Sequence, residues 1–271
     1  MLRISWSSLR THMECKQRGY LHRQKKKATL EDVRNYFPGT ITDRVVREWL
    51  ETDPLNSQGV MPDMVDAVME REEQKIAEGR GILRWRDPED KARVRDECIT
   101  AVTKIEPVLY KFVVPFEYKA DYKFEVPLAV PHPKGGTEKI LLNGFMDIIV
   151  RNDKNQFSVF DVKHTKDEYY WRKTRGQLTF YDLAVWLEQG TQTKATALFQ
   201  PLCKEPVKGF RISETSKDEI IGKIAEMAWD VWSEDHTPRN DTKFCRYCDV
   251  KHACSKFAPS MINGKKVASL L

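Results

Sequence analysis

Two apolar segments in the middle of the chain carry two carboxylates and one amine at a spacing that could do chemistry. The segments ILLNGFMDIIV (140–150) and FSVFDVKH (157–164) are rich in β-branched and aromatic residues, and the polar turn RNDKNQ between them predicts an antiparallel hairpin. A turn centred near Lys154 puts Asp147 opposite Asp161 to within one register step. Directly opposed Cβ atoms lie only about 5 Å apart, and like charges repel there. We therefore expect a cation between the two carboxylates.

Strand alternation adds a lysine to this pair. Asp161 and Lys163 are two residues apart, so their side chains project from the same face, whereas Val162 points into the core. Two carboxylates and the Val162 carbonyl oxygen suit a hard ion such as Mg²⁺ or Mn²⁺. Such an ion lowers the pKa of a bound water for attack on phosphorus, and Lys163 can orient that water or balance charge on the phosphate. The alternative is an ordinary salt bridge at two strand ends.

The segment that follows the hairpin combines aromatic and basic residues and then turns helical. In RGQLTFYDLAVWLEQG, Gln177 and Tyr181 lie one turn apart on one helix face, roughly 6 Å from each other. This amide and phenol could hold a nucleic acid strand or the lysine, although a Tyr on an amphipathic helix is more often a core aromatic. Upstream, 166–175 contains five adjacent residues that could stack unpaired bases and bind phosphates: Tyr169, Tyr170, Trp171, Arg172 and Lys173. A second basic run covers 16–27, and either run could instead be a solvated surface.

Six cysteines mark a second region of possible chemistry. Three of them form the cluster Cys245-x-x-Cys248-x5-Cys254, and Cys15 lies far upstream in SSLRTHMECKQRGYL. In a reducing cytosol, clustered cysteines indicate metal ligation rather than disulfides, and three thiolates leave one coordination position open. Cys98 and Cys203 have no partner at metal-ligand spacing and are expected to be buried small residues.

The rest of the sequence indicates what must position these residues. The 271 residues are 41% hydrophobic and carry a net charge of +5, which suits an ordinary globular protein with a mild preference for polyanions. No segment suits a membrane span or a secretory signal, so we expect a cytoplasmic protein. Helical periodicity covers 8–24, 41–50, 63–78, 88–110, 175–189 and 216–233, and strands are expected over 112–128, 140–150, 157–164 and 193–203. The fold class is therefore α/β, without a phosphate-binding loop for an ATP-driven motor.

The motifs together resemble the RecB-like branch of the PD-(D/E)XK nuclease superfamily. The resemblance rests on their order in the chain, which is Gly144-x-x-Asp147, then Asp161-Val162-Lys163, then Gln177-x-x-x-Tyr181. It implies a restriction-endonuclease-like core, a mixed central sheet flanked by helices, in which both acids bind the metal, the lysine is catalytic, and the Gln and Tyr support the site. The family's upstream helix often has a metal-binding His after a glycine. Counting from Gly39, this chain has Asp43 there, with Glu48 as the fallback, while a simple helix cap is the alternative for Asp43.

The resemblance also assigns the cysteines. One upstream and three C-terminal cysteines look like the arrangement in CRISPR-associated and helicase–nuclease RecB-like enzymes, where four cysteines hold a [4Fe–4S] cluster. Cys15, Cys245, Cys248 and Cys254 would then form an iron–sulfur clasp between the N-terminal helix and the C-terminal segment. Tetrahedral zinc is the competing assignment. On this basis 1–271 is a single nuclease domain, with a helical part over about 1–111, the nuclease core over about 112–233 and the cysteine cluster at 245–254.

The implied activity is Mg²⁺- or Mn²⁺-dependent hydrolysis of DNA from an end, preferring single strands. The resemblance also implies a role in recombination, repair, phage DNA processing or CRISPR adaptation, and the proteins of these pathways would be partners. The expected location is the cytosol of a bacterium or a phage-infected host. An oligomer is possible. A catalytically inactive DNA-binding protein and a zinc-clasped adaptor are the rivals, and an RNA substrate is not distinguished from DNA. Cleavage of end-labelled DNA separates the enzyme from both rivals.

Overall fold

The protein divides into two compact units. The computed structural model describes residues 1–24, 32–52, 54–238, 245, 248–256, 261–262 and 265–266. One unit, here called the cysteine unit, comprises Met1–Thr29, Leu128–Leu141 and Ile221–Leu271, and the other, the carboxylate unit, comprises Leu30–Pro127 and Leu142–Ile220. The long strands β2 (Glu117–Pro131) and β3 (Thr137–Arg151) and helix α7 (Glu214–Trp232) contribute to both units, because the boundaries fall within them. The assignment of the whole chain to one nuclease domain stays a prediction.

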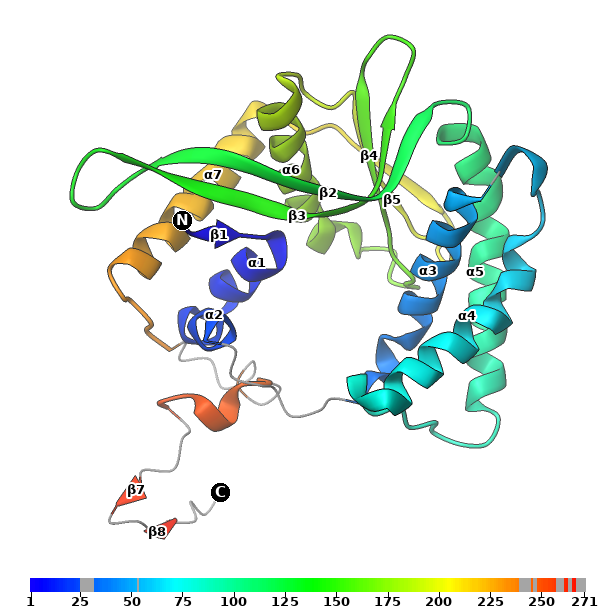
Figure 1. Ribbon diagram of the computed structural model, residues 1–271, viewed down its shortest axis with the longest axis horizontal. Coiled ribbons are helices and arrows are strands. Elements are labelled where there is room, and N and C mark those ends of the chain that lie inside the picture. Colours follow the sequence, from blue (N-terminus) through cyan, green and yellow to red (C-terminus); the bar gives the residue numbers. More distant parts are fainter. Residues whose placement is uncertain are drawn as a thin grey trace. The chain divides into compact units, whose positions relative to one another are not determined.

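The sheet of the carboxylate unit is mixed, as expected from the sequence. Strand β4 (Phe157–Val162) pairs antiparallel with β3 and parallel with β5 (Ala195–Phe199), and β5 pairs antiparallel with β6 (Val207–Phe210). Strand β2 pairs with β3 (Figure 1). The turn between β3 and β4 is closed by the Asn152 side chain, whose Oδ1 accepts hydrogen bonds from the backbone of Lys154 and Gln156 at 3.0 and 2.9 Å. This local closure explains why the turn sequence predicted the hairpin.

Helices of the carboxylate unit form a bundle beside this sheet and a second layer on it. Helices α3 (Phe37–Glu51), α4 (Met61–Lys75) and α5 (Asp90–Phe112) pack together, with a 3-10 turn, η1 (Val33–Asn35), before α3 (Figure 1). Ile41, Val45 and Trp49 form a fully buried stripe at four-residue spacing along α3. Helix α6 (Trp171–Gln189) packs on β4 and β5 and ends at Gly190, whose positive φ of 69° suits glycine. The predicted helices therefore exist, with boundaries that shift by a few residues.

The cysteine unit corrects one expectation about the N-terminus. The sequence predicts a single helix over 8–24, but the structure has α1 (Trp6–Glu14) and α2 (Lys16–Arg23), with Cys15 in an extended conformation between them. Helix α2 folds back so closely that a Cβ atom at Gly19 would lie 3.0 Å from the His12 Cα. The helical period is thus correct, and the break comes from the tertiary packing at Gly19.

Small elements complete the described chain. Strand β1 (Arg3–Ile4) joins the outer end of β3, where the Leu141 amide donates to the Leu2 carbonyl at 2.8 Å. The short elements are η2 (Pro54–Asn56), the π-helical turn η3 (Ile76–Arg80), η4 (Lys251–Ala253), β7 (Met261–Ile262) and β8 (Lys265–Lys266). Within the described part of the chain, no helix combines the length and apolar character needed to cross a membrane.

Candidate active site

The β3–β4 hairpin brings the two predicted carboxylates and the lysine together. Ile148 lies opposite Phe160 in the antiparallel register, so Asp147 and Asp161 are next to each other one step further along. The Lys163 ammonium lies 2.7 Å from Asp161 Oδ2 and 3.8 Å from Asp147 Oδ2. The cation expected between the two carboxylates is therefore the neighbouring lysine.

Val162 links the site to the core. Its side chain is buried in the apolar core of the carboxylate unit, as strand alternation predicted. Its backbone amide donates to Asp147 Oδ2 at 2.8 Å, and its carbonyl oxygen accepts from the Lys163 ammonium at 3.3 Å. The Val162 carbonyl thus faces the same charged groups as the two carboxylates, which is the orientation that a metal-ligand role requires.

Burial makes this cluster electrostatically unusual. Asp161 is fully buried, and loss of solvation together with the nearby Asp147 charge raises its pKa, although Lys163 opposes the shift. For Lys163, burial disfavours the ammonium, but the charges of Asp161 and Asp147 outweigh burial and raise its pKa further. The lysine is therefore held as a cation, which suits it to phosphate binding and makes it a poor general base.

Helix α6 supplies the predicted supporting pair. Gln177 Nε2 donates to Asp161 Oδ1 at 2.9 Å and to the Tyr181 hydroxyl oxygen at 2.8 Å. Tyr181 is buried, and burial together with the two acidic charges raises its pKa, so it remains a neutral phenol. The amide thus fixes one oxygen of Asp161, and the phenol fixes the amide.

Helix α3 brings a third carboxylate to the same place. Asp43 lies in a pocket of about 480 Å³ that it shares with Asp147, Lys163 and the Val162 backbone segment. Burial and the Asp147 charge raise the pKa of Asp43 to about 6. Its Oδ2 also accepts a hydrogen bond from Arg47 at 3.1 Å, and Arg47 in turn contacts Asp121 at 2.8 Å. Asp43 is therefore part of the site and is partly neutralised by an arginine.

Glu48, the alternative to Asp43 on the same helix, lies outside the pocket. Glu48 forms an ion pair with Arg71 at the protein surface and does not line the pocket that contains Asp43. The two acids are five residues apart on α3, so they point to different sides of the helix. The geometry therefore favours Asp43 as the third acidic group.

Sequence reasoning missed His164, which also lines the pocket. Period-two alternation would place its side chain on the face opposite to Lys163, but β4 ends at Val162, so alternation no longer applies. Its ring contacts Thr42 Oγ1 through Nδ1 at 2.7 Å and Glu97 Oε1 through Nε2 at 2.8 Å. Burial lowers its pKa, and a neutral ring can accept from the Thr42 hydroxyl while donating to Glu97. His164 thus ties the active strand to α3 and α5.

The aromatic and basic segment reaches the pocket at one residue. Tyr170 lines the pocket, whereas Tyr169 is 63% exposed and Trp171 packs near Phe210 at 5.9 Å between ring centroids. Arg172 lies over the Tyr169 ring at 4.9 Å, and Lys173 lies over the Tyr170 ring at 5.3 Å. The segment therefore places cation–π pairs at the edge of the site.

The donor set fits a hard divalent cation. The pocket is lined by Asp43, Asp147 and Val162, and Asp161 is buried beside it next to Asp147, so the available ligands are carboxylate and carbonyl oxygens. Asp161 Oδ2 is buried and receives no hydrogen bond of good geometry, so it has acceptor capacity left beside its ion pair. Among the described residues, no group of three or more His, Cys, Asp or Glu side chains is already arranged as a metal site. The carboxylates would have to converge further on an ion.

The four predicted cluster cysteines line one small pocket of the cysteine unit, about 50 Å³ in volume: Cys15, Cys245, Cys248 and Cys254. Leu21 of α2 packs with Val250 and Cys254, and Arg18 contacts Asp249 at 2.9 Å. These contacts connect α2 to the C-terminal segment. The basic run at 16–27 is partly used in such contacts, because Lys16 pairs with Asp230 and Asp235; its residues 25–27 lie outside the described residues.

Cys98 and Cys203 lie away from this pocket. Both are buried, and their thiols point to the carbonyls of Pro38 and Thr165. Burial raises the pKa of both thiols, to about 12 for Cys98. They are small residues of the interior, as expected.

Comparisons with known proteins agree with the geometry. A family model of the PD-(D/E)XK nuclease superfamily matches residues 3–255. No curated protein matches the sequence. A solved structure of a proposed exonuclease from Eubacterium rectale has a TM-score of 0.54 and 10% identity, covering 98% of this chain and 91% of that chain, which shows a similar fold. The crystal structure of SSO0001 has a TM-score of 0.36 and 17% identity and covers 80% of this chain and 95% of that chain.

Proposed function

The chain belongs to the PD-(D/E)XK nuclease superfamily, and from that premise we propose that it is a Mg²⁺- or Mn²⁺-dependent deoxyribonuclease that degrades DNA from an end. The observation that carries the proposal is that Asp43, Asp147 and Lys163 line one pocket, while Asp161, buried beside it, contacts Lys163. A structural salt bridge needs one acid and one base. Three acids and a lysine, with an oriented backbone carbonyl, suit the binding of a cation and a phosphate instead.

Each residue has a distinct task in this proposal. Asp43, Asp147, Asp161 and the Val162 carbonyl would hold the cation, which when bound supplies Lewis acidity and a more acidic water. The Lys163 ammonium would bind a nonbridging oxygen of the scissile phosphate and balance the charge that builds up there. Gln177 fixes Asp161, and Tyr181 fixes Gln177. His164 holds the strand against α3 and is a positioning residue.

Three observations support the degradation of DNA from an end, and the first of them supports a preference for unpaired strands. Tyr170 lines the pocket, and Tyr169 is exposed next to it with Arg172 over its ring, so bases could stack where the strand enters. The net charge of +5 favours a polyanion. A proposed exonuclease from Eubacterium rectale has a similar fold. By resemblance, we also propose that the chain falls in the RecB-like branch. It would act in the cytoplasm in recombination, repair, phage DNA processing or CRISPR adaptation.

We further propose that Cys15, Cys245, Cys248 and Cys254 hold a [4Fe–4S] cluster. The shared pocket of the four thiols supports this assignment, and the extended conformation of Cys15 removes it from the helical ladder. Zinc would use the same four thiolates. Metal analysis and absorbance near 400 nm of anaerobically purified protein separate the two ions, because only the iron cluster absorbs visible light.

End-labelled oligonucleotides test the nuclease proposal. Anaerobically purified protein is incubated with single-stranded DNA, duplex DNA and single-stranded RNA in Mg²⁺ or Mn²⁺, beside a Lys163→Ala variant. Progressive shortening of single-stranded DNA by the wild type alone is expected, and the position of the label gives polarity. Binding without shortening in either metal would favour a catalytically inactive DNA-binding protein, for which the Arg47 contact to Asp43 would be a reason. Shortening of RNA alone would change the substrate.

A further inference from the structure

A second edge of the active-site pocket is formed by the turn before α3. Asn35 and Tyr36 line the pocket together with Asp43 and Lys163. Tyr36 is 66% exposed, and its hydroxyl has no hydrogen-bond partner in the part of the chain that the structure describes. A large exposed aromatic side chain at the edge of a charged pocket makes no contribution to the core. It is available to a ligand.

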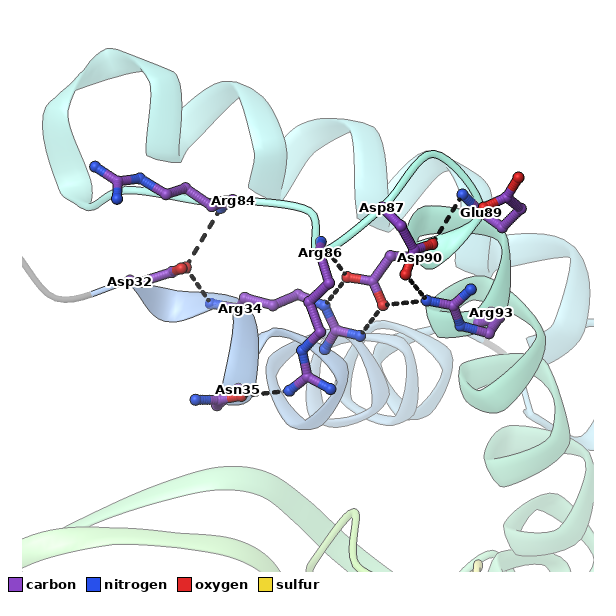
Figure 2. Close-up of polar contacts among 9 residues, drawn as sticks. All are labelled: Asp32, Arg34, Asn35, Arg84, Arg86, Asp87, Glu89, Asp90 and Arg93. Atoms are coloured by element: carbon purple, nitrogen blue, oxygen red, sulfur yellow. Dashed lines mark hydrogen bonds and ion pairs between the residues drawn. The ribbon is translucent and has the colours of Figure 1, made fainter.

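The turn is fixed by a loop, here called the arginine loop (81–89), that precedes α5. The Val33 amide donates to the Ile82 carbonyl at 2.8 Å, and Asp32 Oδ1 accepts from the backbone of Arg34 and Arg84 at 3.0 and 3.3 Å (Figure 2). The two segments therefore run side by side. Their hydrogen bonds set the position of Tyr36 relative to the loop.

A buried ion pair locks this junction. The Arg34 guanidinium forms a two-pronged contact with Asp90, at 2.7 Å for both Nε–Oδ2 and Nη2–Oδ1, and the Arg86 amide donates to the same Oδ2 at 3.0 Å (Figure 2). Trp85 packs edge-on against Phe37 at 5.6 Å and under Arg34 at 5.7 Å. Both carboxylate oxygens of Asp90 accept hydrogen bonds, and Trp85 packs against Phe37 and Arg34. These contacts hold the loop in place.

The loop leaves two arginines without a carboxylate partner. Arg34 and Arg93 are neutralised by Asp90 and Asp87, but within the described residues no carboxylate lies within ion-pair distance of Arg84 or Arg86. The Arg86 guanidinium donates instead to the neutral Asn35 amide oxygen at 2.9 Å, and in Figure 2 it points toward Asn35 while Arg84 points away. A full positive charge is thus held beside a residue of the pocket edge.

From this arrangement we infer that Tyr36 and Arg86 form a binding subsite for one nucleotide of an unpaired strand next to the scissile phosphate. Tyr36 stacks on the base, Arg86 binds the adjoining phosphate, and Asn35 orients Arg86. The inference rests on the proposed nuclease function. It adds a second nucleotide-binding surface at the edge of the pocket, formed by the turn before α3 and the arginine loop. The first such surface is the 169–173 segment at the start of α6. A stacking ring combined with a nearby cation binds single strands without reading their sequence.

A binding assay tests the subsite without turnover. A fluorescein-labelled single-stranded oligodeoxynucleotide of about 12 nucleotides is titrated with protein in Ca²⁺ and in EDTA, and binding is measured by fluorescence anisotropy. Tyr36→Ala is expected to weaken binding about tenfold and to leave its salt dependence unchanged, because stacking releases no counterions. Arg86→Ala is expected to reduce the slope of log K against log salt by about 0.7, the value for one phosphate contact on a single strand.

Matched variants separate the subsite from general charge and exposure. Arg84→Ala removes another exposed arginine of the same loop, and Phe112→Ala removes an exposed aromatic side chain that lies outside the pocket. Both are expected to bind within twofold of wild type. An oligonucleotide with one abasic position, moved along the strand, should weaken wild-type binding at one register and leave Tyr36→Ala unaffected at that register.

Two failures would look different. If wild type binds and shortens the oligonucleotide but Tyr36→Ala and Arg86→Ala match their controls, the subsite is wrong and the nuclease proposal stands. If wild type neither binds nor cleaves, both proposals fall. In kinetics the subsite variants should raise KM with little change in kcat, whereas damage to the catalytic groups would lower kcat.

Discussion

The carboxylate site and the cysteine pocket are held together in different ways. In the carboxylate site, the charged groups already contact protein partners: Lys163 contacts Asp161, Gln177 fixes its other oxygen, and Arg47 contacts Asp43. In the cysteine pocket, thiols from two ends of the chain meet beside a small apolar cluster of Leu21, Val250 and Cys254. The first site is organised by its own charges. If the cysteine pocket holds the proposed cluster, its four thiolates would be held together by the bound metal.

The largest effect is expected at Lys163. Lys163→Ala should reduce DNA cleavage by about 10³-fold, because it removes the charge that balances the phosphate. It should also lower the free energy of unfolding by about 3 kcal/mol, since it leaves the buried Asp161 without its cation. Cleavage assays and urea unfolding measure the two effects.

A double variant distinguishes the two roles of this lysine. Asp161→Asn with Lys163→Met removes both charges and should recover much of the lost stability, without recovering cleavage. Equal stability of the single and double variants would contradict the view that the carboxylate site is organised by its own charges.

The second effect tests the dependence of the cysteine pocket on a metal. Cys254→Ser should abolish absorbance near 400 nm and increase hydrogen exchange of α2 and 248–256 by about tenfold or more. Exchange of β4 and β5 should stay unchanged, because their contacts involve no cysteine of the pocket. Cys98→Ser, at a buried cysteine outside the pocket, is the control for absorbance. Unchanged exchange in α2 would mean that the protein contacts alone hold this pocket.

A smaller effect is expected from the amide that orients Asp161. Gln177→Leu should lower kcat by about 10- to 100-fold with little change in KM, as is typical when the partner of a metal-binding side chain is lost. Tyr181→Phe keeps the ring and removes only the second hydrogen bond, so its effect should be smaller. A larger loss for Tyr181→Phe than for Gln177→Leu would mean that the phenol acts on substrate directly.

The smallest effect concerns pH and the Arg34–Asp90 pair. Hydrogen bonds from Arg34 hold the pKa of Asp90 well below its usual range. A depressed pKa contributes stability that is present above the unfolded-state pKa, about 3.9, and is lost as pH falls toward the folded-state pKa. Asp90→Asn should therefore show a shallower fall in stability below about pH 4 than wild type. Parallel acid unfolding curves would contradict this contribution.

Local periodicity was sufficient for much of the site. The polar turn set the hairpin register, a two-residue spacing put Asp161 and Lys163 on one face, and a four-residue spacing joined Gln177 to Tyr181. These relations depend on geometry within one strand pair or one helix turn. The types and spacing of the residues could therefore predict them.

Tertiary packing decided the rest. Asp43 faces the pocket and Glu48 does not, because the buried stripe of α3 fixes the rotation of the helix. Likewise, the break at Cys15 follows from the close approach of Gly19 to His12, and Arg86 reaches the pocket edge only through the contacts of its loop with the turn before α3. Each depends on which segments pack against one another in the folded chain, and the residue spacing within a single segment does not specify those partners.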